Sequence, residues 1–407
     1  FPFLTVYGFS SLAANPEGVY TNRVGGYPSG GLILVNNLLY GSAQDGGTNG
    51  SGTVYTVNTK LTGSSAAYTF TLLRDVSQFE TNSDGASPNG GLILSGNTLY
   101  GTASIGGTNG AGTVFAMNTN GSGFKILHTF SAPDPVAYTN NDGASPNGGL
   151  ILSGNTLYGT TFDGGTNGIG TVFAVDTNGS GFNVLHTFSA LGPVANTNGD
   201  GAGPNGGLIR SGNTLYGTAN YGGDYGFGTV FEVGTNGMGF ATLYNFTSGD
   251  DGASPYAGLV LASNVLYGTT SEGGYYDYGT IFAIKTNGAN FSVLHVFSGA
   301  DDGGYPSAGL ILSGNTLYGS TESGGLTHSG VVFAMSTVAS NLVALHEFTG
   351  GNEGVNPIGD LLLVGNTLYG TTTGGGANGY GTVFAVSTAP LSAAPQLFIV
   401  RDNANVI

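Results

Sequence analysis

The chain has 407 residues, and its 7 Lys and Arg against 23 Asp and Glu give a formal net charge of -16. This balance argues against nucleic acids and anionic membranes as partners, because both are negatively charged. The sequence contains no Cys, which excludes disulfides and thiol chemistry, and no apolar run approaches the ~18 residues that a membrane span needs, so we expect no membrane insertion.

The first predicted element is a strand at residues 3–9, Phe-Leu-Thr-Val-Tyr-Gly-Phe, which is rich in β-branched and aromatic residues. A long loop then leads to residue 30. The chain starts at Phe1 rather than Met, which we interpret as trimming of the kind that removes a signal peptide.

From residue 31 onward one pattern recurs. The stretch 95–101, Ser-Gly-Asn-Thr-Leu-Tyr-Gly, is repeated unchanged at 153–159, 211–217 and 313–319, and looser copies occur in three other places. The seven tyrosines of Leu-Tyr-Gly are 60, 58, 58, 51, 51 and 51 residues apart: Tyr40, Tyr100, Tyr158, Tyr216, Tyr267, Tyr318 and Tyr369. A period in this range indicates a solenoid, a propeller or an array.

Each complete repeat contains four short, mostly apolar runs bounded by Gly, Asn or Ser, which is typical of strands separated by turns. Seven such repeats predict an all-β fold, a seven-bladed β-propeller of four-stranded blades. Gly101 and Ala103, in the second run, are expected to let neighbouring blades approach closely. The predicted blades span residues 31–77, 91–131, 149–189, 207–247, 258–298, 309–349 and 360–388.

The last repeat lacks its fourth strand, and residues 3–9 resemble the missing one. Pairing the two would close the ring, and we expect a closed propeller domain over residues 1–388 because an open solenoid has no use for a split repeat. The loop between strands two and three then shares one face, termed the upper face, with the loop that leads to the next blade. The two other loops of each blade lie on the lower face.

A short tail, residues 389–407, follows the predicted propeller. Its first part, to Pro395, is typical of a linker, and residues 396–401 predict one more strand. Because a lone strand is not stable, the tail is expected to begin a further domain or to pair with a neighbouring molecule.

The repeat Gly-Leu-Ile-Leu-Ser-Gly-Asn-Thr-Leu-Tyr-Gly-Thr, followed by Gly-Gly and Gly-Thr-Val-Phe-Ala, resembles the GloVer tandem repeat of bacterial choice-of-anchor surface proteins over residues 1–388. The resemblance implies secretion and attachment at the cell surface through a C-terminal region. It implies no known activity, and no catalytic residue is carried over. The Gly106-Gly107 doublet is also similar to kelch repeats, but the absence of Trp argues against kelch and WD40 alike.

An acidic turn, Asp-Gly-x-x-Pro or its Glu variant, precedes the first strand in six repeats, whereas Val24 takes that place in the first. One hypothesis is that the six carboxylates form a partial circle on the upper face and bind a hard cation such as Ca²⁺. The alternative, which we favour, is that each carboxylate caps its own turn through a backbone N–H. The acidic residues are Asp84, Asp142, Asp200, Asp251, Asp302 and Glu353.

Four histidines share one position in the fourth strand: His128, His186, His295 and His346. Tyr244 and Arg74 occupy it in two other repeats. Because one such residue per blade lies on an outer strand, far from its copies, a shared metal cluster is excluded and a structural role is predicted.

The upper-face loops of the fourth and fifth blades are rich in aromatic residues, where the loops of the first three have mostly Thr, Asn and Gly. The repeat does not need these rings, and exposed aromatic clusters mark contact surfaces. They are candidate ligand-binding residues that could stack on sugars or pack against a protein, although they could also merely pack loop on loop. The residues are Tyr221, Tyr225, Phe227, Tyr275, Tyr276 and Tyr278.

The sequence shows no nucleophile with its base, no phosphate-binding loop and no His/Cys metal spacing, so an enzyme is the less favoured interpretation. We expect an extracellular or cell-surface module, with no certain cofactor, that binds glycan or protein through its upper face. Two alternatives remain. One is a structural subunit of a surface layer or fibre that self-associates by donating residues 396–401 to a neighbour's sheet. The other is a polysaccharide lyase or hydrolase, which rests on fold analogy alone.

Overall fold

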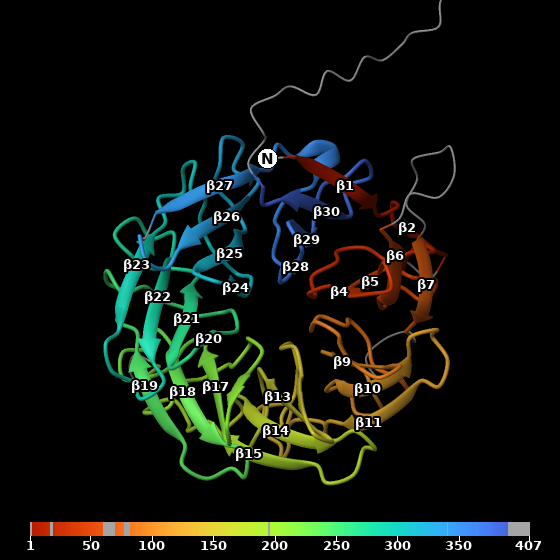
Figure 1. Cartoon of the computed structure of the whole chain (residues 1–407). Coiled ribbons are helices and arrows are strands. Elements are labelled where there is room, and N and C mark those ends of the chain that lie inside the picture. Colours follow the sequence, from red (N-terminus) through yellow and green to blue (C-terminus); the bar gives the residue numbers. More distant parts are fainter. Residues whose placement is uncertain are drawn as a thin grey trace, which may run out of the picture.

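Seven four-stranded antiparallel sheets stand around a central opening in the computed structural model, as Figure 1 shows. The structure describes residues 2–16, 19–59, 70–76, 82–193, 196–339 and 341–389. The prediction of an all-β, seven-bladed propeller with four strands per blade is therefore confirmed. The predicted tail strand, residues 396–401, lies outside the described residues.

The strands occupy equivalent places in every blade. The innermost strands are β4 (Ile33–Val35), β8 (Ile93–Ser95), β12 (Ile151–Ser153), β16 (Ile209–Ser211), β20 (Val260–Ala262), β24 (Ile311–Ser313) and β28 (Leu362–Val364). The second strands are β5 (Leu38–Ala43), β9 (Thr98–Ala103), β13 (Thr156–Thr161), β17 (Thr214–Ala219), β21 (Val265–Thr270), β25 (Thr316–Thr321) and β29 (Thr367–Thr372). The third strands are β6 (Thr53–Asn58), β10 (Thr113–Asn118), β14 (Thr171–Asp176), β18 (Thr229–Gly234), β22 (Thr280–Lys285), β26 (Val331–Ser336) and β30 (Thr382–Ser387).

The outermost strands complete the blades. They are β7 (Phe70–Asp75), β11 (Lys125–Thr129), β15 (Asn183–Thr187), β19 (Ala241–Asn245), β23 (Ser292–Val296), β27 (Leu342–Glu347) and, in blade 7, β1 (Phe3–Gly8). Two small elements are added to this plan. A two-stranded ribbon, β2 (Ala13–Ala14) with β3 (Tyr20–Thr21), forms in the loop before blade 1, and a 3-10 turn, η1 (Gly351–Glu353), lies in the connection to blade 7.

The N-terminal strand closes the ring as predicted. β1 pairs antiparallel with β30, with Phe3 opposite Val386, so that blade 7 has the order β1-β30-β29-β28. At the lower end of this pair the Ser387 N–H donates to the Pro2 carbonyl at 3.0 Å. The beginning of β1 therefore lies beside the end of β30.

The hydrophobic core is divided among the seven blade boundaries. Each boundary has its own cluster; that between blades 2 and 3, for example, packs Val114 and Phe130 against Leu157 and Phe173. The sequence analysis expected Gly101 of Leu-Tyr-Gly to allow close approach of a neighbouring blade, and the structure shows a different role. A Cβ on Gly101 would lie 2.7 Å from the Phe115 ring, which belongs to the same blade, so the glycine makes room for that ring and not for a neighbouring blade.

Candidate ligand-binding face

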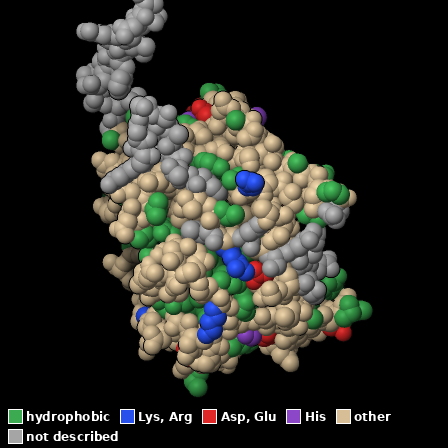
Figure 2. Space-filling view, turned by 90° about the vertical axis from the view of Figure 1, so that its right-hand side faces the viewer, with side chains coloured by type: hydrophobic (Ala, Val, Ile, Leu, Met, Phe, Trp, Pro, Cys, Tyr) green, Lys and Arg blue, Asp and Glu red, His purple; other side chains and the backbone are tan. Residues whose placement is uncertain are grey.

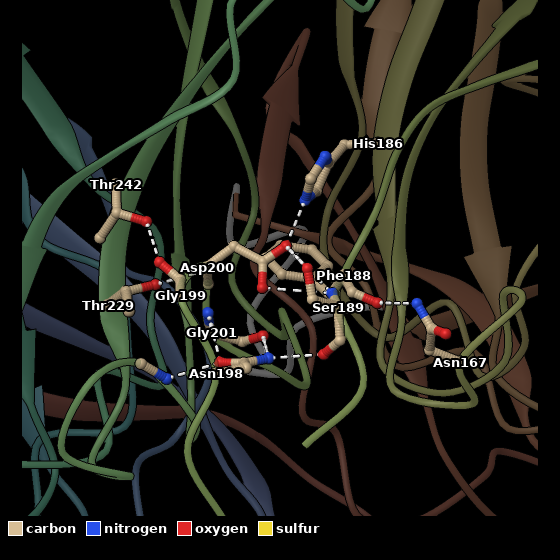
Figure 3. Close-up of polar contacts among 11 residues, drawn as sticks. Asn167, His186, Phe188, Ser189, Asn198, Gly199, Asp200, Gly201, Thr229 and Thr242 are labelled. Carbon is tan, nitrogen blue, oxygen red and sulfur yellow. Dashed lines mark hydrogen bonds and ion pairs between the residues drawn. The ribbon is translucent and has the colours of Figure 1, made fainter. Parts of the chain in front are cut away.

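Six of the seven blade boundaries have an acidic residue that contacts the preceding outer strand, and the boundary between blades 3 and 4 is shown in Figure 3. Nε2 of His186 lies 2.9 Å from Oδ2 of Asp200, and the Ser189 N–H donates to both carboxylate oxygens at 3.0 and 3.2 Å. The Ser189 hydroxyl adds a contact of 3.0 Å. Asp200 is 7% exposed, so these bonds replace the water that a buried carboxylate has lost.

At five other boundaries a carboxylate likewise contacts the outer-strand residue, which is His, Arg or Tyr. The carboxylates contact Arg74 (from Asp84), His128 (from Asp142, 3.0 Å), the Tyr244 hydroxyl (from Asp251, 3.1 Å), His295 (from Asp302, 3.0 Å) and His346 (from Glu353, 3.4 Å). The outer-strand histidines, for which the sequence predicted a structural role, therefore pair with the acidic residues of the turns. The sequence analysis did not assign this partner. At the remaining boundary Val24 takes the place of the acid, and both Val24 and Tyr7 pack against the core cluster.

Stacking extends this contact to the next blade. His128 lies flat on Phe182, with centroids 3.5 Å apart and planes 5° apart, and His186 lies likewise on Phe240 at 3.6 Å. At the seam of the ring, His346 stacks on Phe3 of the closing strand at 3.8 Å. The outer-strand residue is thus fixed on one side by a carboxylate and on the other by an aromatic ring.

The pKa values at the last two connections follow from these contacts. Burial alone would raise the pKa of Asp302, but hydrogen bonds from His295 and Ser298 hold it below its usual value. The pKa of Glu353 is lowered in the same way, chiefly by bonds from Thr349. Burial lowers the pKa of His346, against the opposing pull of Glu353.

The carboxylates of the acidic turns bond differently from the expectation that each caps its own turn. Their carboxylates bond mainly across the connection to the preceding strand. Within the part of the chain that the structure describes, no group of three or more His, Cys, Asp or Glu side chains is placed to hold a metal ion. Ca²⁺ binding by these six residues stays a hypothesis.

An asparagine that the sequence analysis did not single out organises the longer connections. Oδ1 of Asn198 accepts from the N–H groups of Gly201 and Gly223, and its Nδ2 donates to Ser189 and Gly201 carbonyls at 2.7 Å (Figure 3). In the shorter connections a backbone carbonyl replaces this side chain, as when the Gly274 N–H donates to Gly249 at 2.8 Å. The change in repeat spacing, from 58 to 51 residues, marks this switch.

The six predicted aromatic residues do not form one stack. Tyr275 and Tyr276 contact each other edge to face, with centroids 4.8 Å apart. Tyr221 is half-buried and approaches Phe162, and Tyr278 is half-buried against Tyr305 of the next blade. The exposed members are Tyr225 (56%), Phe227 (40%), Tyr275 (78%) and Tyr276 (53%).

Two of the exposed tyrosines replace a residue that the other blades use structurally. At the position of Tyr225 and Tyr276, the second after the Gly-Gly doublet, four blades have Asn and one has Thr. Each of these five side chains donates to the carbonyl just after the outer strand: Asn49, Asn109, Asn167, Thr327 and Asn378. Tyr225 and Tyr276 therefore occupy a position at which the other five blades have a smaller side chain that forms a structural hydrogen bond.

The central opening is lined by polar groups. Its cavity of about 240 Å³ is bordered by Asn89, Asn147 and Asn205, among others. Asp360 stands where the other six blades have Gly, and the Gly309 N–H donates to its Oδ1 at 2.6 Å. The Asp360 side chain is exposed at the opening, and the protein atoms packed around its carboxyl group raise the pKa of that group by desolvation, against the opposing hydrogen bond from the Gly309 N–H.

The flank of blades 1 and 2 carries several of the few Lys and Arg side chains, with hydrophobic side chains in small scattered groups between uncharged polar ones (Figure 2). None of the helical turns in the described residues is long and apolar enough to cross a membrane.

A family model described as the Gloeobacter/Verrucomicrobia repeat matches the chain at residues 12–137, 135–325 and 299–394. A search of curated protein sequences finds no significant match.

Solved propellers resemble the structure at low sequence identity. Oligogalacturonate lyase from Vibrio parahaemolyticus is 9% identical, with a TM-score of 0.54 over 95% of this chain and 98% of its own. A putative 6-phosphogluconolactonase from Bacteroides uniformis is 16% identical, with a TM-score of 0.51 over 82% and 88%. The extracellular domain of a putative one-component system from B. thetaiotaomicron is 9% identical, with a TM-score of 0.52 over 93% of this chain and 39% of that one. These likenesses show the fold alone.

Proposed function

Because the chain belongs to the Gloeobacter/Verrucomicrobia repeat family, whose model covers nearly all of the propeller, we propose that it is an extracellular or cell-surface module that binds glycan or protein through its upper face. The low share of charged residues, 7%, and the resemblance to surface-anchored repeat proteins support this location.

The observation that carries the binding role is the replacement of a structural Asn by Tyr225 and Tyr276. Five blades use the position for a hydrogen bond, whereas blades 4 and 5 expose an aromatic ring there. Exposed rings that the fold does not require are typical of contact surfaces. Glycan is the favoured ligand, because the rings offer faces for sugars to stack on and the exposed Asp224 and Asp277 beside them offer acceptors for hydroxyl groups.

The test compares the native protein with the double variant Tyr225→Asn, Tyr276→Asn on an array of bacterial and plant glycans. The variant copies Asn109 and Asn167, so we expect it to fold and, with two hydrogen bonds regained, to be more stable by about 0.5–1.5 kcal/mol per bond. Glycan binding should be lost.

The control variant is Val136→Ala, which removes another exposed side chain of the upper face (Val136 is 85% exposed) and should leave glycan binding unchanged. Unaltered binding by the double asparagine variant would remove blades 4 and 5 as the site. Binding of a protein partner that depends on the same two tyrosines, without any glycan, would assign the surface to proteins instead.

Neither alternative function gains a specific observation. The structural-subunit hypothesis depends on residues 396–401, which lie outside the described residues. The lyase hypothesis depends on a likeness of fold, which many unrelated functions share.

A further inference from the structure

A pocket on the upper face lies at the seam between blades 7 and 1. It encloses about 400 Å³ and is lined by Leu12, Val19, Tyr20, Tyr27, Asp45 and Tyr380; it is termed the Tyr27 pocket. Tyr27 and Tyr380 meet edge to face, with centroids 5.4 Å apart and planes at 68°. Tyr20, from the added ribbon, is 63% exposed at the rim. Three tyrosines thus surround a concave site.

Asp45 brings a carboxylate to this pocket. Its backbone is fixed by two hydrogen bonds with Gly26, of 2.9 and 3.2 Å, so its place is set by the fold. Burial raises the pKa of Asp45, and among the residues that the structure describes none forms a hydrogen bond or ion pair with its carboxylate. A half-buried carboxylate without a partner is a group that a ligand can satisfy.

The other blade boundaries provide internal comparisons. The equivalent positions are identified by a conserved backbone bond: Tyr27 N–H to Tyr380 at 3.0 Å, Ser145 N–H to Ala111 at 3.0 Å, and Tyr305 N–H to Tyr278 at 2.9 Å. The boundary of blades 2 and 3 keeps an acid, Asp163, at the bridge position but has neither of the two rings.

The boundary of blades 5 and 6 has the opposite combination. It has two rings, Tyr278 and Tyr305, but Ser323 replaces the acid. Across the seven boundaries, at these three positions, only the seam combines two tyrosines with a carboxylate.

Tyr27 is also held in an unfavourable backbone conformation. Its φ is 55°, in the left-handed region where bulky side chains are disfavoured, and most other blades place Ser, Gly or Asn at this position. The fold imposes this conformation on the equivalent residues too, since φ is 55° at Ser145 and 57° at Tyr305, so the backbone does not require a tyrosine at this position.

We propose that the Tyr27 pocket binds an organic ammonium group. The faces of the tyrosines attract a cation, and the Asp45 carboxylate supplies its counter-charge. The net charge of -16 draws cations toward the protein. Amino sugars, lysine side chains and choline head groups carry such a group. This site is separate from the aromatic loops of blades 4 and 5, and its test is independent of theirs.

The test measures binding of choline and of 3,3-dimethylbutan-1-ol, its uncharged carbon analogue, by calorimetric titration of the whole chain. Choline should bind at least about tenfold more tightly than the analogue, the size expected of a partly desolvated cation–π contact. Asp45→Asn and Tyr27→Ser should each weaken choline binding about tenfold or more. Tyr27→Ser copies Ser145, so the fold is expected to accept it.

Asp163→Asn and Tyr305→Ser are the matched controls at the two other boundaries and should leave choline binding unchanged. Glucosamine against glucose, and Nα-acetyl-lysine amide against Nα-acetyl-norleucine amide, then show which source of the ammonium group the pocket prefers. Equal affinity for choline and its neutral analogue, or no binding of any of the three ammonium probes, would overturn the proposal.

Discussion

The contact between a carboxylate and an outer-strand side chain is the smallest unit that holds one blade to the next. The chain itself contains three versions of it, namely His with an acid, Arg74 with Asp84, and Tyr244 with Asp251. At the seventh boundary Val24 and Tyr7 pack against the core instead. A carboxylate stays on one side of the contact while its partner changes among His, Arg and Tyr, and a double-mutant cycle measures the coupling energy of such a pair.

A substitution series in blades 3 and 4 measures this coupling. His186→Tyr copies the Tyr244 pair and should cost less than about 1 kcal/mol. Asp200→Val leaves buried donors without an acceptor and should cost about 1–3 kcal/mol. The double variant copies Tyr7 with Val24 and should recover part of that loss. Urea denaturation followed by circular dichroism gives the values, and a double variant that loses the sum of both single effects would show that the pair is uncoupled.

Acid should loosen the last two connections. The pKa values of Asp302 and Glu353 are lower in the folded chain, so their contribution is fully present above the unfolded carboxylate pKa of about 4 and is lost as the pH falls through the folded values. The pKa of His346 is also lowered, so its contribution is present above about pH 6.5 and declines on acidification.

Melting temperatures measured from pH 7 to pH 3 at constant ionic strength check this expectation. The native protein should be more stable than Asp302→Asn at neutral pH, and the gap between them should narrow below about pH 4. A gap that stays constant over the whole range would mean that the lowered pKa of Asp302 does not contribute to folding.

At the scale of elements, β1 carries the closure of the ring. Phe3 stacks on His346 and lies within 6.0 Å of the Phe348 and Phe384 rings, so one side chain joins blades 6 and 7. Its neighbour Leu4 is 46% exposed.

Phe3→Ala should therefore cost about 1–3 kcal/mol, and Leu4→Ala, on the same strand, should stay within about 0.5 kcal/mol. In the Phe3→Ala variant, backbone amides of β30 should lose protection from hydrogen exchange first, because β1 pairs with the outer edge of β30. Equal effects of the two substitutions would mean that the strand is held by its backbone pairing and not by the aromatic contacts.

The elements were predictable because four apolar runs recur at a nearly constant period, and the split repeat showed how the ring closes. The side-chain pairs were not. His128 and Asp142 are 14 residues apart, whereas His295 and Asp302 are 7 apart, so no fixed spacing marks them. Tyr27 and Tyr380 come from opposite ends of the sequence, and only the closed ring brings them together. The six aromatic residues were recognised as exceptions to the repeat, but which of them are exposed and which are half-buried depends on loop geometry.

At the scale of the whole molecule, charge and assembly are the properties to measure. With 23 acidic and 7 basic residues, the chain should not bind DNA or anionic vesicles at physiological salt. For a binding module we expect light scattering to give the mass of one chain. A long, ordered assembly would favour the structural subunit, and deletion of residues 390–407 should then abolish it.

The hydrogen bond between Ser387 and Pro2 has a consequence for the direction in which the molecule is displayed. Blade 7 is divided between its third and fourth strands, and the loop that joins these strands in every other blade lies on the lower face. Any segment joined before Pro2 or after Ser387 therefore departs from that side. A tether at either end would leave both the exposed tyrosines and the Tyr27 pocket pointing away from the attachment, whereas a division between the second and third strands would have turned them toward it.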